Sequence, residues 1–316
     1  MQFETFIQNT DFILAEGSVY ERLRRHPSVE FDPHLAYGTF IYEPDTADVL
    51  ESVHREYLDI GQRYGLPMIA TTPTWRANQE RINRSRFKDA KINQDNVQFM
   101  LDLRASYPAD GPPIFIAGII GPRGDAYRPD EAPSKAEAER FHAAQIEALA
   151  ETRLDLVYIA TLPSFSEAQG LASAMAKTGL PYILSFVIRP SGTLLDGTPF
   201  HQVIDTIDDQ TARPPLGYSV NCVHPTVLQQ GLSLNELEKR GLAQRIISFM
   251  ANTSAKSPEE LDGLAELDTT APAPFAEQMW ATYEQFRPRI VGGCCGTGTE
   301  HIECIAQQQA RTPLGT

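Results

Sequence analysis

The cysteines are the residues of this chain whose type and spacing indicate chemistry. There are four of them, Cys222, Cys294, Cys295 and Cys304, which is too few for a disulfide scaffold in a chain of 316 residues. In a reducing compartment such thiols serve as metal ligands, nucleophiles or core residues. Cys304 lies within a helical pattern, TEHIECIAQQQA, and we expect it to be a small buried side chain without a functional role.

The other three cysteines could form a metal site. Cys294 and Cys295 are adjacent, and the side chains of adjacent residues diverge in a regular strand or helix. Two glycines precede the pair and Gly296 follows it, which permits a left-handed or bulged backbone that would turn both sulfurs the same way. With Cys222 they would offer three thiolates, a set that selects zinc over magnesium or calcium and leaves one ligand position for a substrate. The spacing leaves a second interpretation equally open, a glycine-rich turn with two half-buried thiols and an unrelated third.

The cysteines need secondary structure that brings them together. Short apolar segments alternate with longer amphipathic stretches, which is typical of parallel strands connected by helices. The predicted strands are 12–15, 67–71, 113–119, 155–160, 181–188, 216–221, 245–250 and 289–292. The clearest predicted helices are 46–64, 92–106, 135–152, 164–178, 272–286 and 299–310. Eight such strands favour an α/β fold of the closed (β/α)8 type, a TIM barrel, over an open doubly wound sheet, and we expect residues 1–316 to form one domain.

The active site of such a barrel lies at the carboxyl ends of its strands. Cys222 directly follows the predicted strand 216–221, and the adjacent pair follows the strand 289–292. Asn221 and Asn252 also lie at strand ends, where an amide could orient a ligand or the loop that bears Cys222, or simply form a turn. His224 lies two residues after Cys222, and we expect it to be a surface or supporting residue and not a metal ligand paired with that cysteine.

The charge of the chain excludes some classes of partner. It has 27 Lys and Arg against 41 Asp and Glu, a net charge of -14, and no block of basic residues. Nucleic acid and anionic membranes are poor partners for such a surface, so we expect small molecules. No apolar run approaches the roughly 18 residues of a membrane span, and the amino terminus lacks a signal layout. We therefore expect a cytoplasmic protein.

Motifs along the whole chain resemble one protein family. VNCVHP at 220–225 and GGCCGTGTEHIECIA at 292–306 are similar to the two cysteine motifs of the homocysteine S-methyltransferase family, whose members are zinc-dependent (β/α)8 barrels. Further similar stretches are LAEGSVYERLRR at 14–25, TTPTWRAN at 71–78, IAGIIGPRGDAY at 116–127, SFVIRPSGTLLDGTPF at 185–200 and MAN at 250–252. The resemblance implies that Cys222, Cys294 and Cys295 are the zinc ligands and catalytic residues. It implies substrate-binding positions at Glu16, Gly17, Trp75, Thr161 and Asn221.

The activity that this resemblance implies is methyl transfer to a thiol. Zinc removes the proton of a coordinated thiol, and the resulting thiolate attacks the methyl carbon of an activated donor. The resemblance accounts for one barrel and leaves no residues for the folate- or cobalamin-binding modules of the large methionine synthases. A small donor is therefore expected, S-methylmethionine or S-adenosylmethionine before betaine, with homocysteine as the default acceptor and methionine as the product.

Three positions depart from the family pattern. Family members commonly carry Glu-Thr at the end of strand four, where the carboxylate holds the amino group of homocysteine, and this chain has Ala160-Thr161. Glu16 stands in place of the usual Asp, and Trp75 in place of a Tyr that can occupy the vacant zinc position. The alternatives are therefore a methyltransferase for a different thiol or selenol, or a zinc-binding barrel without homocysteine turnover.

Two further motifs bear on the site. Zinc hydrolases of this fold present paired histidines as HxH near the first strand, and none of the seven histidines here has that spacing, which argues against a hydrolase. Thr297 and Glu300 have the spacing of a capping box, so we expect Thr297 to begin the last helix.

Overall fold

A closed barrel of parallel strands forms the centre of the protein. The computed structural model describes residues 2–234, 237–261 and 268–311. Within these residues eight strands follow one another around the barrel in chain order, and β1 pairs with both β2 and β8 to close it. The strands are β1 (Ile13–Ala15), β2 (Met68–Thr71), β3 (Ile114–Ile120), β4 (Leu156–Leu162), β5 (Tyr182–Phe186), β6 (Gly217–Asn221), β7 (Ile246–Ala251) and β8 (Ile290–Gly293). The closed sheet confirms the predicted TIM barrel.

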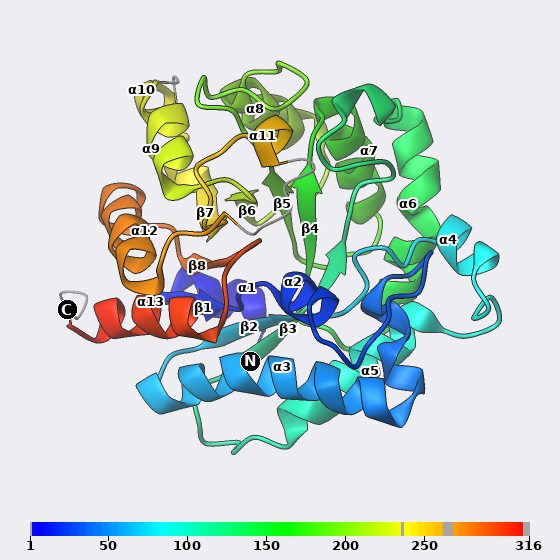
Figure 1. The fold of residues 1–316 in the computed structure, drawn as a ribbon. Helices are drawn as coiled ribbons and strands as arrows, with labels where there is room; N and C mark the ends of the chain where they lie inside the picture. Colours follow the sequence, from blue (N-terminus) through cyan, green and yellow to red (C-terminus); the bar gives the residue numbers. More distant parts are fainter. Residues whose placement is uncertain (1, 235–236, 262–267, 312–316) are drawn as a thin grey trace.

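Helices form the outer layer around this barrel (Figure 1). The α-helices are α1 (Phe3–Gln8), α2 (Val19–Arg24), α3 (Pro44–Tyr64), α4 (Gln79–Arg84), α5 (Ile92–Ala105), α6 (Lys135–Ala150), α7 (Phe165–Met175), α8 (Phe200–Gln210), α9 (Pro225–Leu234), α10 (Leu237–Arg240), α11 (Pro258–Leu261), α12 (Pro272–Phe286) and α13 (Thr299–Arg311). Short 3-10 helices cover Tyr37–Tyr42, Pro129–Glu131 and Ala243–Arg245. Because helices cover the outer face and side chains fill the interior, the strands are buried on both faces.

Apolar side chains close the amino-terminal end of the barrel. Phe3 and Ile7 of α1 belong to the same core cluster as the first residues of several strands. Phe115 of β3 lies 5.0 Å from the ring of Phe3 and 4.9 Å from the ring of Phe6, measured between ring centroids. Since this end is filled, a site that binds small molecules has to open at the carboxyl ends of the strands.

Local sequence explains where the long helix α3 begins and ends. Pro44 begins α3, where a missing N–H costs nothing, and Gly65 ends it in the left-handed conformation with φ +67. The strand predicted at 181–188 is shorter in the structure, because β5 ends at Phe186 and Ile188 pairs with Leu194 in an isolated bridge of the following loop. The last two residues of the apolar segment 181–188 therefore belong to the loop after β5 and not to the barrel.

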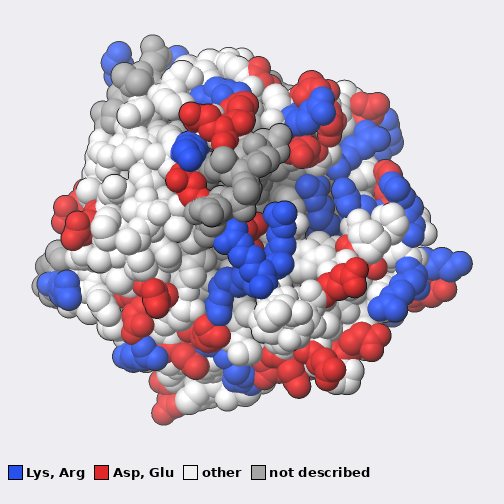
Figure 2. Space-filling view, viewed as in Figure 1, with Lys and Arg blue, Asp and Glu red and all other residues white. Residues whose placement is uncertain are grey.

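The surface carries charges of both signs. Figure 2 shows acidic and basic side chains mixed over one face, with a group of basic side chains over α2. No helix among the described residues combines the length and apolar character that a membrane crossing requires.

Candidate metal centre and substrate pocket

Three of the four cysteines meet at the carboxyl end of the barrel. Cys222 follows β6, and Cys294 and Cys295 follow β8. Their sulfurs all lie within 4.8 Å of one another, and among the described residues they form the only group of three His, Cys, Asp or Glu side chains that could hold a metal ion. Cys222 and Cys294 are joined by a disulfide, and the sulfur of Cys295 lies 3.8 Å from that of Cys222. Cys304 lies elsewhere, partly buried against the outer core.

The backbone at Cys222 has an unusual conformation. Its φ is +55, a left-handed value that costs free energy for a residue with a Cβ. Three hydrogen bonds compensate for it. The N–H of Cys222 donates to the carbonyl of Met250 (3.1 Å). Asn252 supplies the other two: its side-chain amide donates to the carbonyl of Cys222 (3.3 Å), and its backbone N–H donates to the carbonyl of Val223 (3.0 Å). Asn252 therefore holds the loop that bears Cys222, one of the two roles expected for it.

The glycines around the cysteine pair have two different functions. Gly296 adopts φ +81, and a Cβ there would lie 2.0 Å from the hydroxyl of Thr253. Gly292 and Gly293 are not left-handed, but a Cβ on Gly292 would lie 2.7 Å from the Cβ of Ala15. We expected the glycines to supply unusual backbone angles, and only Gly296 does so. Gly292 lets β8 approach β1 closely, and Gly293 leaves room for the side chain of Thr297.

Thr297 connects the cysteine turn to the segment between β1 and α2. Its hydroxyl donates to the carbonyl of Cys294 (2.6 Å) and accepts from the N–H of Ser18 (3.1 Å). The predicted capping box of Thr297 and Glu300 is wrong, because α13 begins two residues later at Thr299 and this hydroxyl is used by the turn.

Asn221, at the end of β6, links three strands to the sulfur cluster. Its Oδ1 accepts from the N–H of Thr161 (3.0 Å) and the hydroxyl of Ser185 (2.6 Å), while its Nδ2 donates to the hydroxyl of Thr161 (3.1 Å). The same Nδ2 lies 4.0 Å from the sulfur of Cys294. Thr161 is itself left-handed, with φ +64. The amide therefore orients the end of β4 and also places a donor beside a sulfur.

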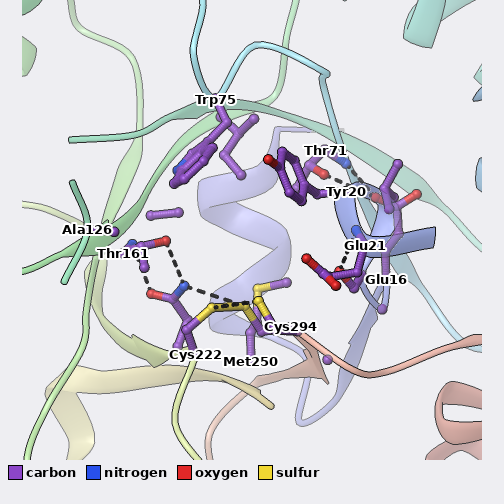
Figure 3. Close-up of a pocket in the computed structure, with 18 of the residues that line it drawn as sticks. Glu16, Tyr20, Glu21, Thr71, Trp75, Ala126, Thr161, Cys222, Met250 and Cys294 are labelled. Atoms are coloured by element: carbon purple, nitrogen blue, oxygen red, sulfur yellow. Dashed lines mark hydrogen bonds between the residues drawn. A yellow bond between two sulfur atoms is a disulfide. The ribbon is translucent and has the colours of Figure 1, made fainter. Parts of the chain in front are cut away.

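Glu16, at the end of β1, is almost completely buried, and its carboxylate contacts the protein through both oxygens. Oε1 lies 2.5 Å from Nδ1 of His54 on α3, and Oε2 accepts from the N–H (2.9 Å) and the hydroxyl (3.2 Å) of Thr71. Figure 3 shows this carboxylate turned toward Thr71 and away from the sulfurs. The next residue has to be Gly17, because a Cβ there would lie 2.7 Å from the hydroxyl of Tyr57.

A pocket of about 440 Å³ opens above the sulfur cluster. All of the residues that the sequence predicted to bind metal or substrate line it: Glu16, Gly17, Trp75, Thr161, Asn221, Cys222, Cys294 and Cys295. Its other aromatic residues are Tyr20, Tyr37, Tyr127 and Tyr158, and its other charged residues are Arg24, Glu21, Arg76 and Asp125. At the end of β4 the wall is the methyl group of Ala160, which is buried.

Trp75 forms one wall of this pocket (Figure 3). Its indole packs against Gly121, where a Cβ would lie 2.5 Å from Nε1, and the guanidinium of Arg76 lies 4.1 Å from the ring centroid. Burial, and then the nearby charge of Arg81, lower the pKa of Arg76 to about 10. The group still carries its positive charge at neutral pH.

The thiol of Cys295 is hard to ionise in the absence of a cation. Burial raises its pKa to about 12, and the negative charge of Glu21 adds to the increase. A cation bound among the sulfurs would offset both effects, since it favours the thiolate.

His224 does not belong to the sulfur cluster. It is buried, and its Nδ1 lies 2.8 Å from the hydroxyl of Thr226, where it also accepts from the N–H of Thr226 at the start of α9 (3.3 Å). The side chain therefore orders the loop after Cys222 and supplies no ligand, as we expected, although it is not on the surface.

Comparison with known sequences identifies the family. The sequence model described as homocysteine S-methyltransferase matches residues 13–309. The chain belongs to this family. It is 31% identical over 318 residues to homocysteine S-methyltransferase YbgG of Bacillus subtilis, covering 93% of each chain. It is 25% identical to homocysteine S-methyltransferase of Escherichia coli, over 69% of this chain and 71% of that one. The protein is accordingly a methyltransferase.

Solved structures of the homocysteine methyltransferase MmuM from Escherichia coli share the fold. Its oxidised form superposes with a TM-score of 0.72 at 21% identity, covering 96% of this chain and 97% of that one. Its metallated form superposes with a TM-score of 0.70 at 22% identity, covering 96% and 98%. The barrel is therefore the fold of a known member of the homocysteine S-methyltransferase family.

Sequence patterns did not single out Glu21 or His54. Glu21 lies on α2, and its carboxylate faces the cysteines in Figure 3. His54 lies in the middle of α3 and reaches Glu16 from a distance of 38 residues along the chain. Glu21 is the one acid of the short helix α2, and His54 is one of several buried positions of α3, so spacing alone could not distinguish either.

Proposed function

We propose that this member of the family is a zinc-dependent S-methyltransferase that moves a methyl group from a small activated donor to a thiol, by default homocysteine. The observation that carries the proposal is the cluster of three cysteine sulfurs within 4.8 Å of one another, on the floor of a pocket at the carboxyl end of a barrel. We take residues 1–316 to be one catalytic domain, since the family match spans 13–309 and the barrel closes within it.

The donor set fits zinc. Three thiolates are soft ligands that suit zinc, and three protein ligands leave a fourth position for a substrate, as in catalytic zinc sites. Cys222 and Cys294 form a disulfide in this structure, so both would have to be reduced before they could hold a metal ion. When bound, zinc would supply an acceptor sulfur in its thiolate form.

The residues of this chain support the reaction by positioning. Asn221 fixes the end of β4 and places an amide donor 4.0 Å from the sulfur of Cys294. Asn252 holds the carbonyl of Cys222 and so the direction of its side chain. Gly17, Thr161 and Trp75 line the pocket in which an acceptor would lie.

The pocket favours a cationic methyl donor. Its walls include Trp75 and four tyrosines, and a sulfonium or quaternary ammonium group is attracted to the faces of such rings. S-methylmethionine and S-adenosylmethionine are the first candidates and betaine is the third, since a pocket of about 440 Å³ holds molecules of this size.

A combined measurement tests the proposal. The reduced protein is loaded with zinc, its metal content is measured, and it is incubated with a panel of thiols, one selenol and the three donors, with methylated products detected by mass spectrometry. We expect stoichiometric zinc and S-methylation of at least one thiol. Absence of methyl transfer from every donor, with zinc bound, would overturn the assignment in favour of a barrel that only binds the metal.

A further inference from the structure

A thiol acceptor with an amino group brings a positive charge into the pocket. An ammonium group that leaves water is strongly disfavoured unless a carboxylate pairs with it. The described residues of β4 that line the pocket are Tyr158, Ala160, which is 4% exposed, and Thr161, and none of them carries a carboxylate. The carboxylates that line the pocket are those of Glu16, Glu21 and Asp125.

Two of these three acids are poorly placed for the task. The carboxylate of Glu16 contacts His54 through Oε1 and Thr71 through Oε2, and it is turned away from the sulfurs (Figure 3). Asp125 is exposed, where water screens its charge, and its Oδ1 accepts from the N–H of Tyr127 (2.8 Å).

Glu21 has the position that the other two lack. It lies in the first turn of α2, where its N–H donates to the hydroxyl of Ser18 (3.2 Å) and so fixes its backbone. Its side chain is only 16% exposed, and its carboxylate points toward Cys294 and the sulfur cluster (Figure 3).

One oxygen of Glu21 is available to a ligand. Oε2 accepts from Arg25 (3.1 Å), and Oε1 lies 3.6 Å from Arg24, too far for a hydrogen bond. Within the described part of the chain, no hydrogen bond to Oε1 is formed. Both arginine side chains are at least half exposed, and such surface pairs contribute little.

We propose that Glu21 is a specificity-determining residue, which pairs with the ammonium group of an α-amino thiol while the sulfur of that thiol lies at the cysteine cluster. This inference rests on the proposed function. It places the selectivity for an amino-acid acceptor on the first turn of α2, on the side of the pocket away from the end of β4.

Substitution of Glu21 tests the inference with two acceptors. Homocysteine and 4-mercaptobutanoate have the same carbon chain and differ in the amino group. In the zinc-loaded Glu21→Gln variant we expect KM for homocysteine to rise about 10- to 100-fold, the value of a lost charge-assisted hydrogen bond. KM for 4-mercaptobutanoate should stay within about twofold, because it has no ammonium group to lose a partner. Glu21→Asp, which keeps the charge on a shorter side chain, should restore part of the selectivity.

The matched control is Glu51→Gln. Glu51 pairs with Arg55 four residues later on α3, as Glu21 pairs with Arg25 on α2, but it is not among the residues that line the pocket. It should leave the ratio of the two KM values unchanged. Zinc content, the melting temperature and calorimetric Kd values for both thiols are measured for each variant, so that a loss of metal or of folding is separated from a loss of recognition.

The outcomes separate this inference from the proposed function. A wild-type protein that methylates both thiols equally well, or a Glu21→Gln variant that keeps the full preference for homocysteine, would overturn the role of Glu21 and leave the methyltransferase assignment intact. A rise in KM for both thiols alike would assign Glu21 a general structural role and also overturn the inference. If the wild-type protein methylates no thiol, the proposed function fails, and the role of Glu21 fails with it.

Discussion

The four cysteines lie in two different environments, and only three of them belong to the pocket. The sulfurs of Cys222, Cys294 and Cys295 converge on one point of the pocket, whereas Cys304 lies on α13 against the outer core. A metal ion held by the three would depend on each of them, and its loss would leave the barrel core untouched because the cluster lies beyond the strand ends.

We therefore expect Cys294→Ala and Cys222→Ala to lose most of the zinc that the reduced wild-type protein binds, about one ion per chain. Both variants should keep the circular dichroism spectrum of the folded barrel. Metal content after gel filtration gives the answer, with Cys304→Ser as the control that retains zinc. Full zinc retention in either pocket variant would contradict the assignment of the ligands.

The buried pair of His54 and Glu16 should contribute both to the stability of the barrel and to the shape of the pocket. His54→Leu leaves a buried carboxylate without its histidine, which should cost about 3 kcal/mol of the free energy of unfolding, measured by urea denaturation. Because Glu16 lines the pocket, KM for the acceptor should rise as well.

The comparison variant is His142→Leu. His142 pairs with Glu167 at 2.9 Å, and both side chains are buried, but neither lines the pocket. It should lower stability to a similar extent and leave KM unchanged. Equal effects of the two variants on KM would show that the pair at Glu16 acts only through stability.

Among the secondary-structure elements, the turn between β8 and α13 determines the geometry of the site. It carries two adjacent cysteines, and Gly296 lets the chain turn at φ +81 where a Cβ would lie 2.0 Å from the hydroxyl of Thr253. The hydroxyl of Thr297 then connects the turn to Ser18. The direction of both cysteine side chains thus depends on contacts that one added methyl group would displace.

We expect Gly296→Ala to destabilise the protein by about 1–3 kcal/mol, because it combines a left-handed backbone with a steric clash. Its zinc affinity should fall as well, since the turn positions two of the proposed ligands. Gly298→Ala is the control, because a Cβ there meets nothing within 4 Å. Thermal unfolding and zinc titration of both variants test this, and an unchanged Gly296→Ala variant would show that the turn adapts without cost.

For the whole molecule, the oxidation state of the cysteines should control the stability that zinc provides. A ligand that binds only the folded state stabilises it by about 2.7 kcal/mol at 100 times its Kd. Zinc can bind the three sulfurs only after the bond between Cys222 and Cys294 is reduced.

We accordingly predict that zinc raises the melting temperature of the reduced protein by about 5 °C and has little effect on the oxidised one. Peroxide should abolish activity, and dithiothreitol followed by zinc should restore it, since the disulfide is reversible. Differential scanning calorimetry and activity assays check both statements. Undiminished activity in peroxide would argue against a mechanism that depends on thiolates and a metal.

The sequence by itself favoured the barrel, and its spacing left the cysteine cluster as one of two open interpretations until the family resemblance was considered. Parallel strands covered on both faces appear as short apolar runs, so all eight were visible without a structure. Cys222, Cys294 and Cys295 follow the ends of two such strands, and in a barrel the carboxyl ends of all strands meet at one rim. The family resemblance then pointed to methyl transfer, because its motifs include these same residues.

Only the tertiary structure decided which acid faces the sulfurs. Glu16 follows a strand and fits the family pattern, yet His54 and Thr71, from elements far from it in the chain, turn its carboxylate away. Glu21 lies within the stretch LAEGSVYERLRR, but nothing in that stretch distinguishes it, and only the structure shows that its side chain lines the pocket and faces the cysteines (Figure 3). The direction of a side chain depends on contacts between distant segments, and sequence spacing contains no information about those contacts.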